Sequence, residues 1–188
     1  MSRWQPDAGS RIERAALELF EQQGFAETTV PQITERAGLT TRTFFRHFAD
    51  KREVLFAFDT QLPGIVEGLM AAAPAGLSPM GVIRSALTTV ATVNLADQRE
   101  HLHLHRSIVQ SDDGLREREL RKHSILAEAT RLGFLTRGTD ELTATLGAHV
   151  ATTAFTVSID RWLDAAAERS LESVLHDVLD GLEGLLHD

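Results

Sequence analysis

The chain has 188 residues, no cysteine and no tyrosine; 43% of its residues are hydrophobic, 24% are charged, and its formal net charge is −8. This composition favours packed cores over disorder, and the lack of cysteine excludes disulfide scaffolds, zinc fingers and thiolate chemistry. Residues 1–10 have no apolar core behind their positive charge, and no stretch reaches the roughly 18–20 uninterrupted apolar residues of a membrane span, so we expect a soluble, cytoplasmic protein.

The front of the chain shows clear helix signals. Apolar residues recur at helical spacing throughout, and no alternation of period two lasts long enough to indicate a strand, so we expect an all-α fold of about nine helices. Ser10 is expected to cap the first helix with Glu13 as its capping-box partner, and Gly24 to end it. Thr29 opens a second helix, with Gln32 completing another capping box.

Two further short helices are predicted directly after these. Thr40 caps a helix over about residues 41–47, and Asp50 caps a fourth over about residues 51–62, which Pro63 interrupts. The turn of about three residues around Gly38 is typical of a helix-turn-helix, in which glycine takes the left-handed backbone that the sharp turn requires. The second helix of such a pair lies in the major groove of DNA.

The rest of the chain is also predicted to be helical. An Ala/Pro/Gly-rich loop is expected over residues 71–79, and Gly133 and Gly138 are expected to punctuate the chain between later helices. The predicted helices after the loop are about 79–94, 97–109, 113–131, 140–163 and 168–187. The last has an apolar stripe broad enough to need two neighbours.

Charge is unevenly distributed along the chain. Residues 1–52 carry eight Lys/Arg and seven Asp/Glu, a net of +1, whereas the remainder has a net of −9. Charges more than about 8–10 Å apart across solvent are largely screened at physiological salt, so acidity elsewhere does not exclude a DNA-binding end. The sequence therefore indicates a molecule of two parts.

The third predicted helix carries the residues best suited to DNA. Arg42 and Arg46 are four residues apart, hence on one helix face, and each can pair with guanine O6/N7 or with a phosphate. Thr29 and Lys51, each at the start of a helix, suit phosphate contacts. Phe45 is expected either to pack against the DNA backbone sugars or to fill the small core. The expected DNA contacts are Thr29, Thr40, Thr41, Arg42, Thr43, Phe45, Arg46, His47 and Lys51.

A dozen positions between about residues 11 and 58 stand in a fixed register. They include Glu27-Thr28-Thr29-Val30, Ile33, Ala37-Gly38-Leu39-Thr40, Thr43-Phe44-Phe45-Arg46-His47-Phe48, Lys51, Val54 and Leu55. This pattern resembles the TetR family of bacterial transcriptional regulators. The family usually has Tyr at Phe45 and a small residue at Arg42, so one polar contact of about 0.5–1.5 kcal/mol is lost and a charge is gained.

The resemblance implies a DNA-binding regulator, most often a ligand-responsive repressor, that binds a palindromic operator as a homodimer. Residues 1–52 are then the DNA-binding domain and residues 53–188 the effector-binding and dimerisation domain, with helix 51–62 connecting them. The residues expected at the dimer interface are Leu142, Leu146, Val150, Val157, Leu171, Val174, Leu175, Val178 and Leu182.

A mostly apolar effector is expected, with His105 or His149 as its polar anchor. The residues expected to line its pocket are Leu87, Val90, Leu104, His105, Ile108, Leu126, Phe134, His149, Phe155 and Trp162. Neither a cofactor nor a metal is expected.

Two alternatives stay open. His101 and His105 share one helix face at a spacing known from metal sites, which would suit a helical metal-dependent enzyme, although nothing specifies a third ligand. An acidic helical adaptor that does not bind DNA is the other. The prediction is a protein that is not an enzyme.

Overall fold

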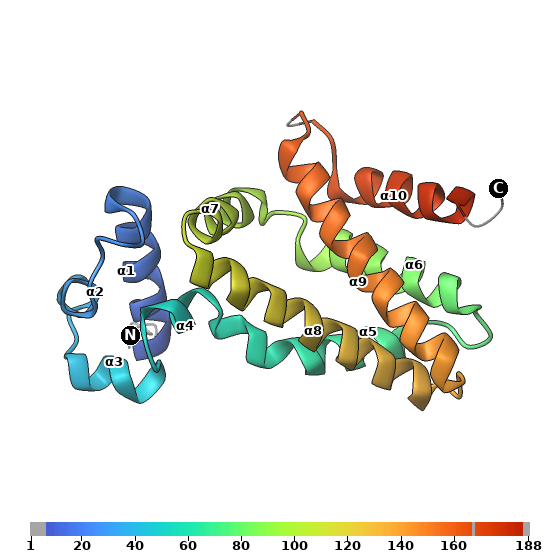
Figure 1. Ribbon diagram of the computed structural model, residues 1–188, viewed down its shortest axis with the longest axis horizontal. Coiled ribbons are helices and arrows are strands. Elements are labelled where there is room, and N and C mark those ends of the chain that lie inside the picture. The colour runs from blue at the N-terminus through green and yellow to red at the C-terminus, as the bar shows by residue number, and fades with distance from the viewer. Residues whose placement is uncertain (1–6, 167, 186–188) are drawn as a thin grey trace, which may run out of the picture. The chain divides into compact units, whose positions relative to one another are not determined.

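The computed structural model describes residues 7–166 and 168–185, and every regular element within them is helical (Figure 1). Its α-helices are α1 (Ala8–Gln23), α2 (Val30–Ala37), α3 (Thr41–His47), α4 (Lys51–Leu55), α5 (Leu62–Ala72), α6 (Pro79–Thr89), α7 (Arg99–Gln110), α8 (Asp113–Thr136), α9 (Glu141–Asp164) and α10 (Leu171–Leu185). A 3-10 turn, Ala57–Gln61, separates α4 from α5, and a π-helical turn, Val90–Asn94, continues α6. The all-α expectation is confirmed.

Two expected helix boundaries in the first part of the chain are wrong. The cap of α1 is Asp7, whose carboxylate accepts a hydrogen bond from the Ser10 backbone N–H at 2.9 Å, so Ser10 lies inside the helix instead of capping it with Glu13. The helix predicted over residues 51–62 ends at Leu55. Pro63 lies in the first turn of α5, where its missing N–H leaves no helical hydrogen bond unmade.

The local signals around the helix-turn-helix are confirmed. The Thr29 hydroxyl accepts from the Gln32 backbone N–H at 3.5 Å, while the Gln32 side chain accepts from the Thr29 N–H at 2.8 Å. Gly38 has φ 64° and ψ 40°, the left-handed conformation that lets α2 end and α3 start at a sharp angle. Thr40 and Asp50 accept backbone N–H groups at the starts of α3 and α4.

The chain packs as two compact units. The first takes in residues up to Thr60 together with Leu104–Glu119, and the second takes in Gln61–His103 and the residues from Leu120 onward. Both α7 and α8 therefore run from one unit into the other. The boundary predicted after residue 52 instead lies inside the first unit.

A single hydrophobic cluster explains the extent of the first unit. Phe44 and Phe56 are fully buried in it with residues of α1 and α2. The end of α7 and the start of α8 add Ile108, Val109 and Leu115 to the same cluster. These late residues complete the core under α4, and the three helices at the front are not a closed unit by themselves.

In the second unit, α9 packs against α6 and α10. Its inner face is made of small residues, and a Cβ added at Gly147 would lie 2.9 Å from the Phe134 ring. Gly133, predicted to punctuate the chain, lies inside α8, where an added Cβ would lie 2.6 Å from Met70 Cγ. Gly138, with φ 84°, follows the end of α8 at Thr136 as expected.

Among the described residues, α9 is long and apolar enough to cross a membrane by length and composition, with a mean hydropathy of 1.3. Polar residues such as His149 and Ser158 interrupt its sequence, so it is not the uninterrupted apolar run sought above. Its face from Ala144 to Ser158 is buried within the second unit. The remainder of its apolar window is more exposed, and 28% of that window is buried.

Candidate DNA-binding site

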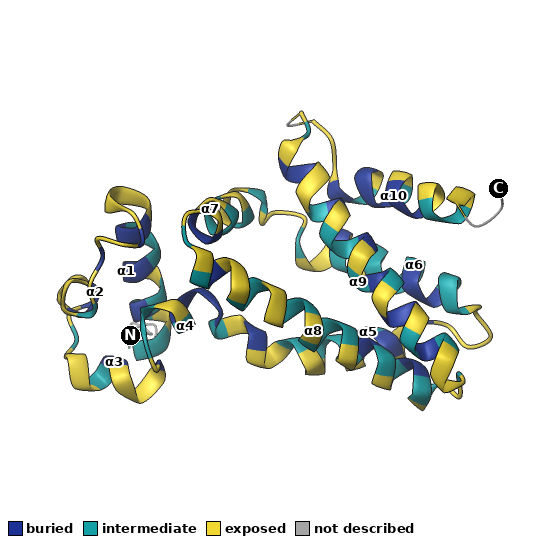
Figure 2. Ribbon diagram, viewed as in Figure 1, coloured by how far each residue is buried: buried dark blue, intermediate teal, exposed yellow. Residues whose placement is uncertain are grey.

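Helix α3 is held to the first unit by one side and exposes the other. Phe44 is fully buried, and its ring lies 5.7 Å from that of Phe48, which is 9% exposed. Phe45 points outward and is 59% exposed, so of the two positions expected for this ring, the core position is wrong. Thr41, Arg42, Arg46 and His47 are exposed as well, and most of α3 is coloured accordingly in Figure 2.

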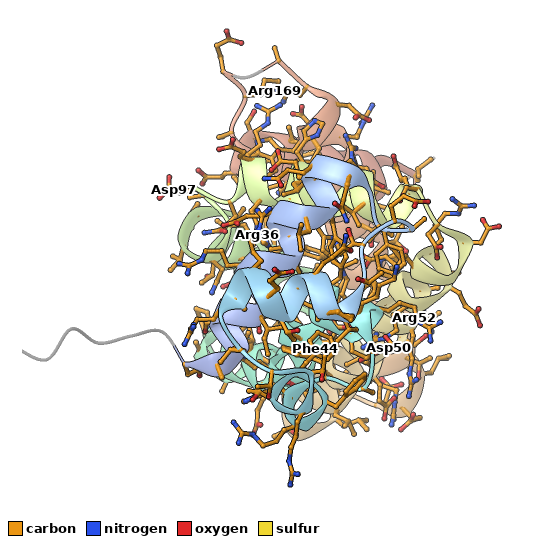
Figure 3. The ribbon with its side chains drawn as sticks, turned by 90° about the vertical axis from the view of Figure 1, so that its left-hand side faces the viewer. Arg36, Phe44, Asp50, Arg52, Asp97 and Arg169 are labelled. Atoms are coloured by element: carbon orange, nitrogen blue, oxygen red, sulfur yellow. The ribbon has the colours of Figure 1, made fainter. Side chains whose placement is uncertain are left out.

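The structure narrows the set of cations that can meet DNA. Arg36 is held by Glu18 at 3.2 Å and by Gln22 at 3.0 Å, and Arg52 is paired with Asp50 at 2.7 Å (Figure 3). Arg42 and Arg46, in contrast, project from α3, where Arg46 lies 3.4 Å from the neighbouring His47 ring. The exposed face of α3 thus retains two unneutralised guanidinium groups one helical turn apart.

Lys51 has a different role from the predicted one. Its ammonium donates to the backbone carbonyls of Phe25 at 2.6 Å, Ala26 at 3.1 Å and Thr28 at 2.8 Å, and lies 4.4 Å from the centre of the Phe25 ring. An ammonium has three N–H donors, and all three are used here. Burial lowers the pKa of Lys51. The geometry contradicts a phosphate contact and makes Lys51 the anchor of the turn that leads into α2.

The threonines expected at the DNA surface are exposed or half-buried, but they also serve as caps. Thr29 lies at the exposed N-terminus of α2, where its hydroxyl is 2.9 Å from the Gln32 side-chain oxygen. The hydroxyls of Thr40 and Thr43 share a hydrogen bond of 3.0 Å at the start of α3. These side chains orient the two helix starts.

Arg11 was not predicted to contribute to this site. Its guanidinium donates to the carbonyls of Ala37 at 2.5 Å and Gly38 at 3.4 Å, which are left open at the end of α2. It also lines a groove of about 360 Å³ between α1 and α2, together with Glu18 and Arg36. The sequence gives only the separation of 27 residues between Arg11 and Gly38, and that separation does not indicate the contact.

The residues expected to line the effector pocket are not brought together in one unit. Leu104, His105 and Ile108 belong to the first unit, where Ile108 is 5% exposed in the core and Leu104 packs against that core. The edge of the His105 ring points at Phe56, with the ring centres 5.7 Å apart. That these three line one pocket with the other seven stays a prediction.

The other seven lie in the second unit in different environments. Phe134 and Trp162 are 1% and 3% exposed, and the Trp162 indole N–H donates to the Arg169 carbonyl at 3.0 Å, so both fill the core. His149 is exposed and is not placed to anchor a buried ligand. The half-buried members are Leu87, Val90, Leu126 and Phe155.

The residues expected at the dimer interface separate by helix. On α9, Leu142, Leu146 and Val157 are 69%, 58% and 39% exposed, and Val150 is half-buried. On α10, by contrast, the broad stripe is used within the chain, because it packs against α9 and α6. Leu182 is half-buried, whereas the other four are only 2–8% exposed and leave almost no surface for a second copy: Leu171, Val174, Leu175 and Val178.

The histidine-rich start of α7 gains no third ligand from the described residues. His101 and His103 are exposed, while His105 packs on Phe56. Within residues 7–166 and 168–185, no three histidine or carboxylate side chains are grouped so that they could hold a metal ion. The alternative of a metal-dependent enzyme receives no support from this geometry.

The part of the chain that contains the helix-turn-helix is similar to known proteins. The profile of the family described as bacterial regulatory proteins, tetR family, matches residues 12–58. The HTH-type transcriptional regulator TcmR of Streptomyces glaucescens is 43% identical over 83 residues, which cover 43% of this chain and 35% of TcmR. The matched part thus spans only about a third of that relative.

Solved structures are similar over nearly the whole chain. Thermus thermophilus FadR, a TetR-family repressor in complex with lauroyl-CoA, is 27% identical, with 96% of each chain covered and a TM-score of 0.62. SmeT in complex with triclosan shares the fold, with 17% identity, 96% of this chain and 91% of SmeT covered, and a TM-score of 0.66. Together with the helix-turn-helix geometry, the profile match shows that residues 12–58 form a DNA-binding region of the kind found in bacterial regulatory proteins of the tetR family, and the solved structures show that the whole chain shares their fold.

Proposed function

We propose that the chain is a cytoplasmic transcriptional regulator, a repressor, that binds a palindromic DNA operator through α3 as a homodimer. The observation that carries this proposal is the exposed face of α3, where Arg42 and Arg46 project one turn apart while Arg36, Lys51 and Arg52 are held by their own chain. Arginine binds guanine O6/N7 or phosphate through its forked donors, so these two guanidinium groups, neither of which is paired with a carboxylate of the described residues, suit a major groove. The proposal assigns no catalytic step to the chain.

Two copies are needed for tight and specific binding. A single short recognition helix buries too little surface, whereas two joined copies can read half-sites about 34 Å apart. The exposed leucines of α9, Leu142 and Leu146, are the surface that we assign to the second copy, with Val157 further along the helix. Without a second copy, these large apolar side chains of α9 would be exposed to water, which is unfavourable.

A small, mostly apolar effector is proposed for the second unit. The half-buried Leu87, Val90, Leu126 and Phe155 are suited to an apolar ligand. The lauroyl-CoA bound to Thermus thermophilus FadR and the triclosan bound to SmeT both carry apolar groups, which supports this class of effector. An effector that prefers the state unable to bind DNA lowers DNA affinity by its differential affinity for the two states.

The test is a salt titration of DNA binding, using the footprinted region upstream of the chain's own gene. Arg42→Ala and Arg46→Ala should each weaken binding by roughly tenfold or more, since one good base contact contributes about 1–3 kcal/mol. Arg36→Ala is the matched control, because it removes the same charge from a side chain that is held by Glu18. Wild-type protein that does not bind DNA at about 50 mM salt would refute the proposal.

The same titration distinguishes the two kinds of contact. A variant that has lost a phosphate contact shows a salt slope reduced by about one and an unchanged preference among sequences. A variant that has lost a base contact keeps its slope and tolerates substitution at one operator position.

A further inference from the structure

Arg118, in the second turn of α8, contacts three residues of the segment that leaves the DNA-binding helices. Its Nη1 lies 2.8 Å from Asp59 Oδ2, and its Nε lies 3.2 Å from Glu53 Oε1. Its guanidinium carbon lies 4.7 Å from the centre of the Phe56 ring. One side chain therefore contacts α4, its C-cap and the 3-10 turn that follows it. We call Arg118, Glu53, Phe56 and Asp59 together the junction.

Most of this junction is buried, unlike the other ion pair of the same helix end, and Glu53 is its exposed member, with 41% of its side chain exposed. The side chains of Arg118 and Asp59 are 17% and 6% exposed, and Phe56 is 2% exposed. Arg116, two residues earlier, pairs with Asp113, whose side chain is 90% exposed. A buried pair is screened little by salt and is costly to break, whereas an exposed pair contributes almost nothing to stability.

The junction lies within the first unit, and its residues are close in sequence to points where the chain leaves that unit. The chain leaves the first unit after Thr60, one residue beyond Asp59, and α8 leaves it after Glu119, one residue beyond Arg118. The remaining passage lies within α7, just before His105. The Phe56 ring is contacted by the Arg118 guanidinium on its face, and it lies 5.7 Å from the His105 ring, which meets it edge-on. Asp59 also donates its backbone N–H to the Phe56 carbonyl at 3.0 Å.

A continuous set of contacts connects this junction with the DNA-binding helices. Glu53 and Phe56 belong to α4 and its C-cap, and α4 starts at Lys51. Lys51 in turn holds the carbonyls of the turn from Phe25 to Thr28, directly before α2. The orientation of α4 thus also determines where the turn into the helix-turn-helix is anchored.

Resting on the proposed function, we propose that Arg118 is a positioning residue for operator binding: it holds α4 in the orientation that keeps α2 and α3 ready to read DNA. Arg118 acts through Glu53, Phe56 and Asp59 and does not touch the DNA. Its loss lowers operator affinity in protein that remains folded, and it leaves the number of phosphate contacts unchanged.

The experiment uses the full chain and four variants. Arg118→Met alone removes the guanidinium contact from the buried Asp59 carboxylate, so the double variant Asp59→Asn/Arg118→Met removes both charges. Arg118→Lys keeps one ion pair but not the forked contact to two carboxylates. Arg116→Met is the matched control on the same helix, because its ion pair with Asp113 and its hydrogen bond to the Gln110 carbonyl are both exposed. Operator affinity, its salt slope and thermal unfolding are measured for each.

The double variant should bind the operator at least tenfold more weakly at a temperature where circular dichroism shows it folded, with the wild-type salt slope. Arg118→Lys should recover part of that loss, and Arg116→Met should match the wild type. Wild-type affinity in the double variant overturns the proposal, as does a loss of affinity in the variants that only follows their unfolded fraction. A slope reduced by about one overturns it as well, because Arg118 would then contact phosphate. Failure of the wild type to bind DNA would instead refute the proposed function.

Discussion

Replacing Lys51 with methionine tests whether this side chain anchors a turn or contacts DNA. Methionine keeps most of the apolar stem beside Phe25 but removes three hydrogen bonds from a charged donor and a contact with the ring. Hydrogen bonds to charged groups contribute about 1.5–3 kcal/mol each, and an exposed cation–π contact about 0.5–1 kcal/mol.

The net effect is smaller than the sum of these contributions. The bond to Ala26 is exposed, so that carbonyl can bind water instead, and the freed side chain regains up to about 2 kcal/mol of rotamer entropy. We therefore expect Lys51→Met to lower the free energy of unfolding by about 2–3 kcal/mol. Urea unfolding followed by circular dichroism measures this change, with Arg14→Met, an exposed cation of α1, as the control.

The salt dependence of DNA binding supplies the second measurement. A lost phosphate contact reduces the slope of log affinity against log salt by about 0.9, whereas a displaced turn lowers affinity at an unchanged slope. Unchanged stability together with a reduced slope would show that the ammonium leaves its three carbonyls for DNA, and the reasoning from this geometry would be refuted.

Three further predictions follow from the packing and the caps. Gly147→Ala should destabilise the chain by about 1–3 kcal/mol in urea unfolding, because its Cβ would lie 2.9 Å from Phe134, whereas Gly68→Ala, with open space around it, should not. Leu146→Glu should produce monomers in analytical ultracentrifugation, while Leu175→Ala, 2% exposed, should instead cost about 2–5 kcal/mol of stability. The hydrogen bond from Arg52 lowers the pKa of Asp50, so the stabilisation of α4 by Asp50 is present above the unfolded-state pKa and is lost as pH falls through the folded-state pKa. Asp50→Asn should therefore make the free energy of unfolding fall less steeply at acid pH. An unchanged acid part of the stability profile would contradict this assignment.

The features that the sequence predicts well are those decided by neighbouring residues. Thr29, Gly38 and Thr40 act within one turn of chain, and their caps and left-handed backbone are found as expected. The helix predicted over about residues 140–163 is α9, and Asp140 caps it by accepting the Thr143 backbone N–H at 3.0 Å. Arg42 and Arg46 share an exposed face because a helical period of 3.6 residues places them there.

Features that depend on distant partners could not be predicted in this way. The interpretation of Gly133 as punctuation is wrong: Gly133 lies inside α8, where Met70, far away in sequence, packs closely against it. Lys51 was assigned to phosphate because nothing in its neighbourhood indicates that carbonyls 23–26 residues earlier take its donors. The stripe of α10 was correctly expected to need two neighbours, but they are α9 and α6 of the same chain.

The discontinuous first unit has a consequence for exchanging its parts between proteins. Ile108, Val109 and Leu115 complete the core under α4, and Arg118 holds the segment that follows it, although all four are encoded far downstream of the helix-turn-helix. A hybrid made by joining the first sixty residues to the C-terminal part of another protein would lack these four residues. A transplant that keeps the first unit intact has to carry residues 104–119 as well, so recombination is constrained at two places in the gene instead of one.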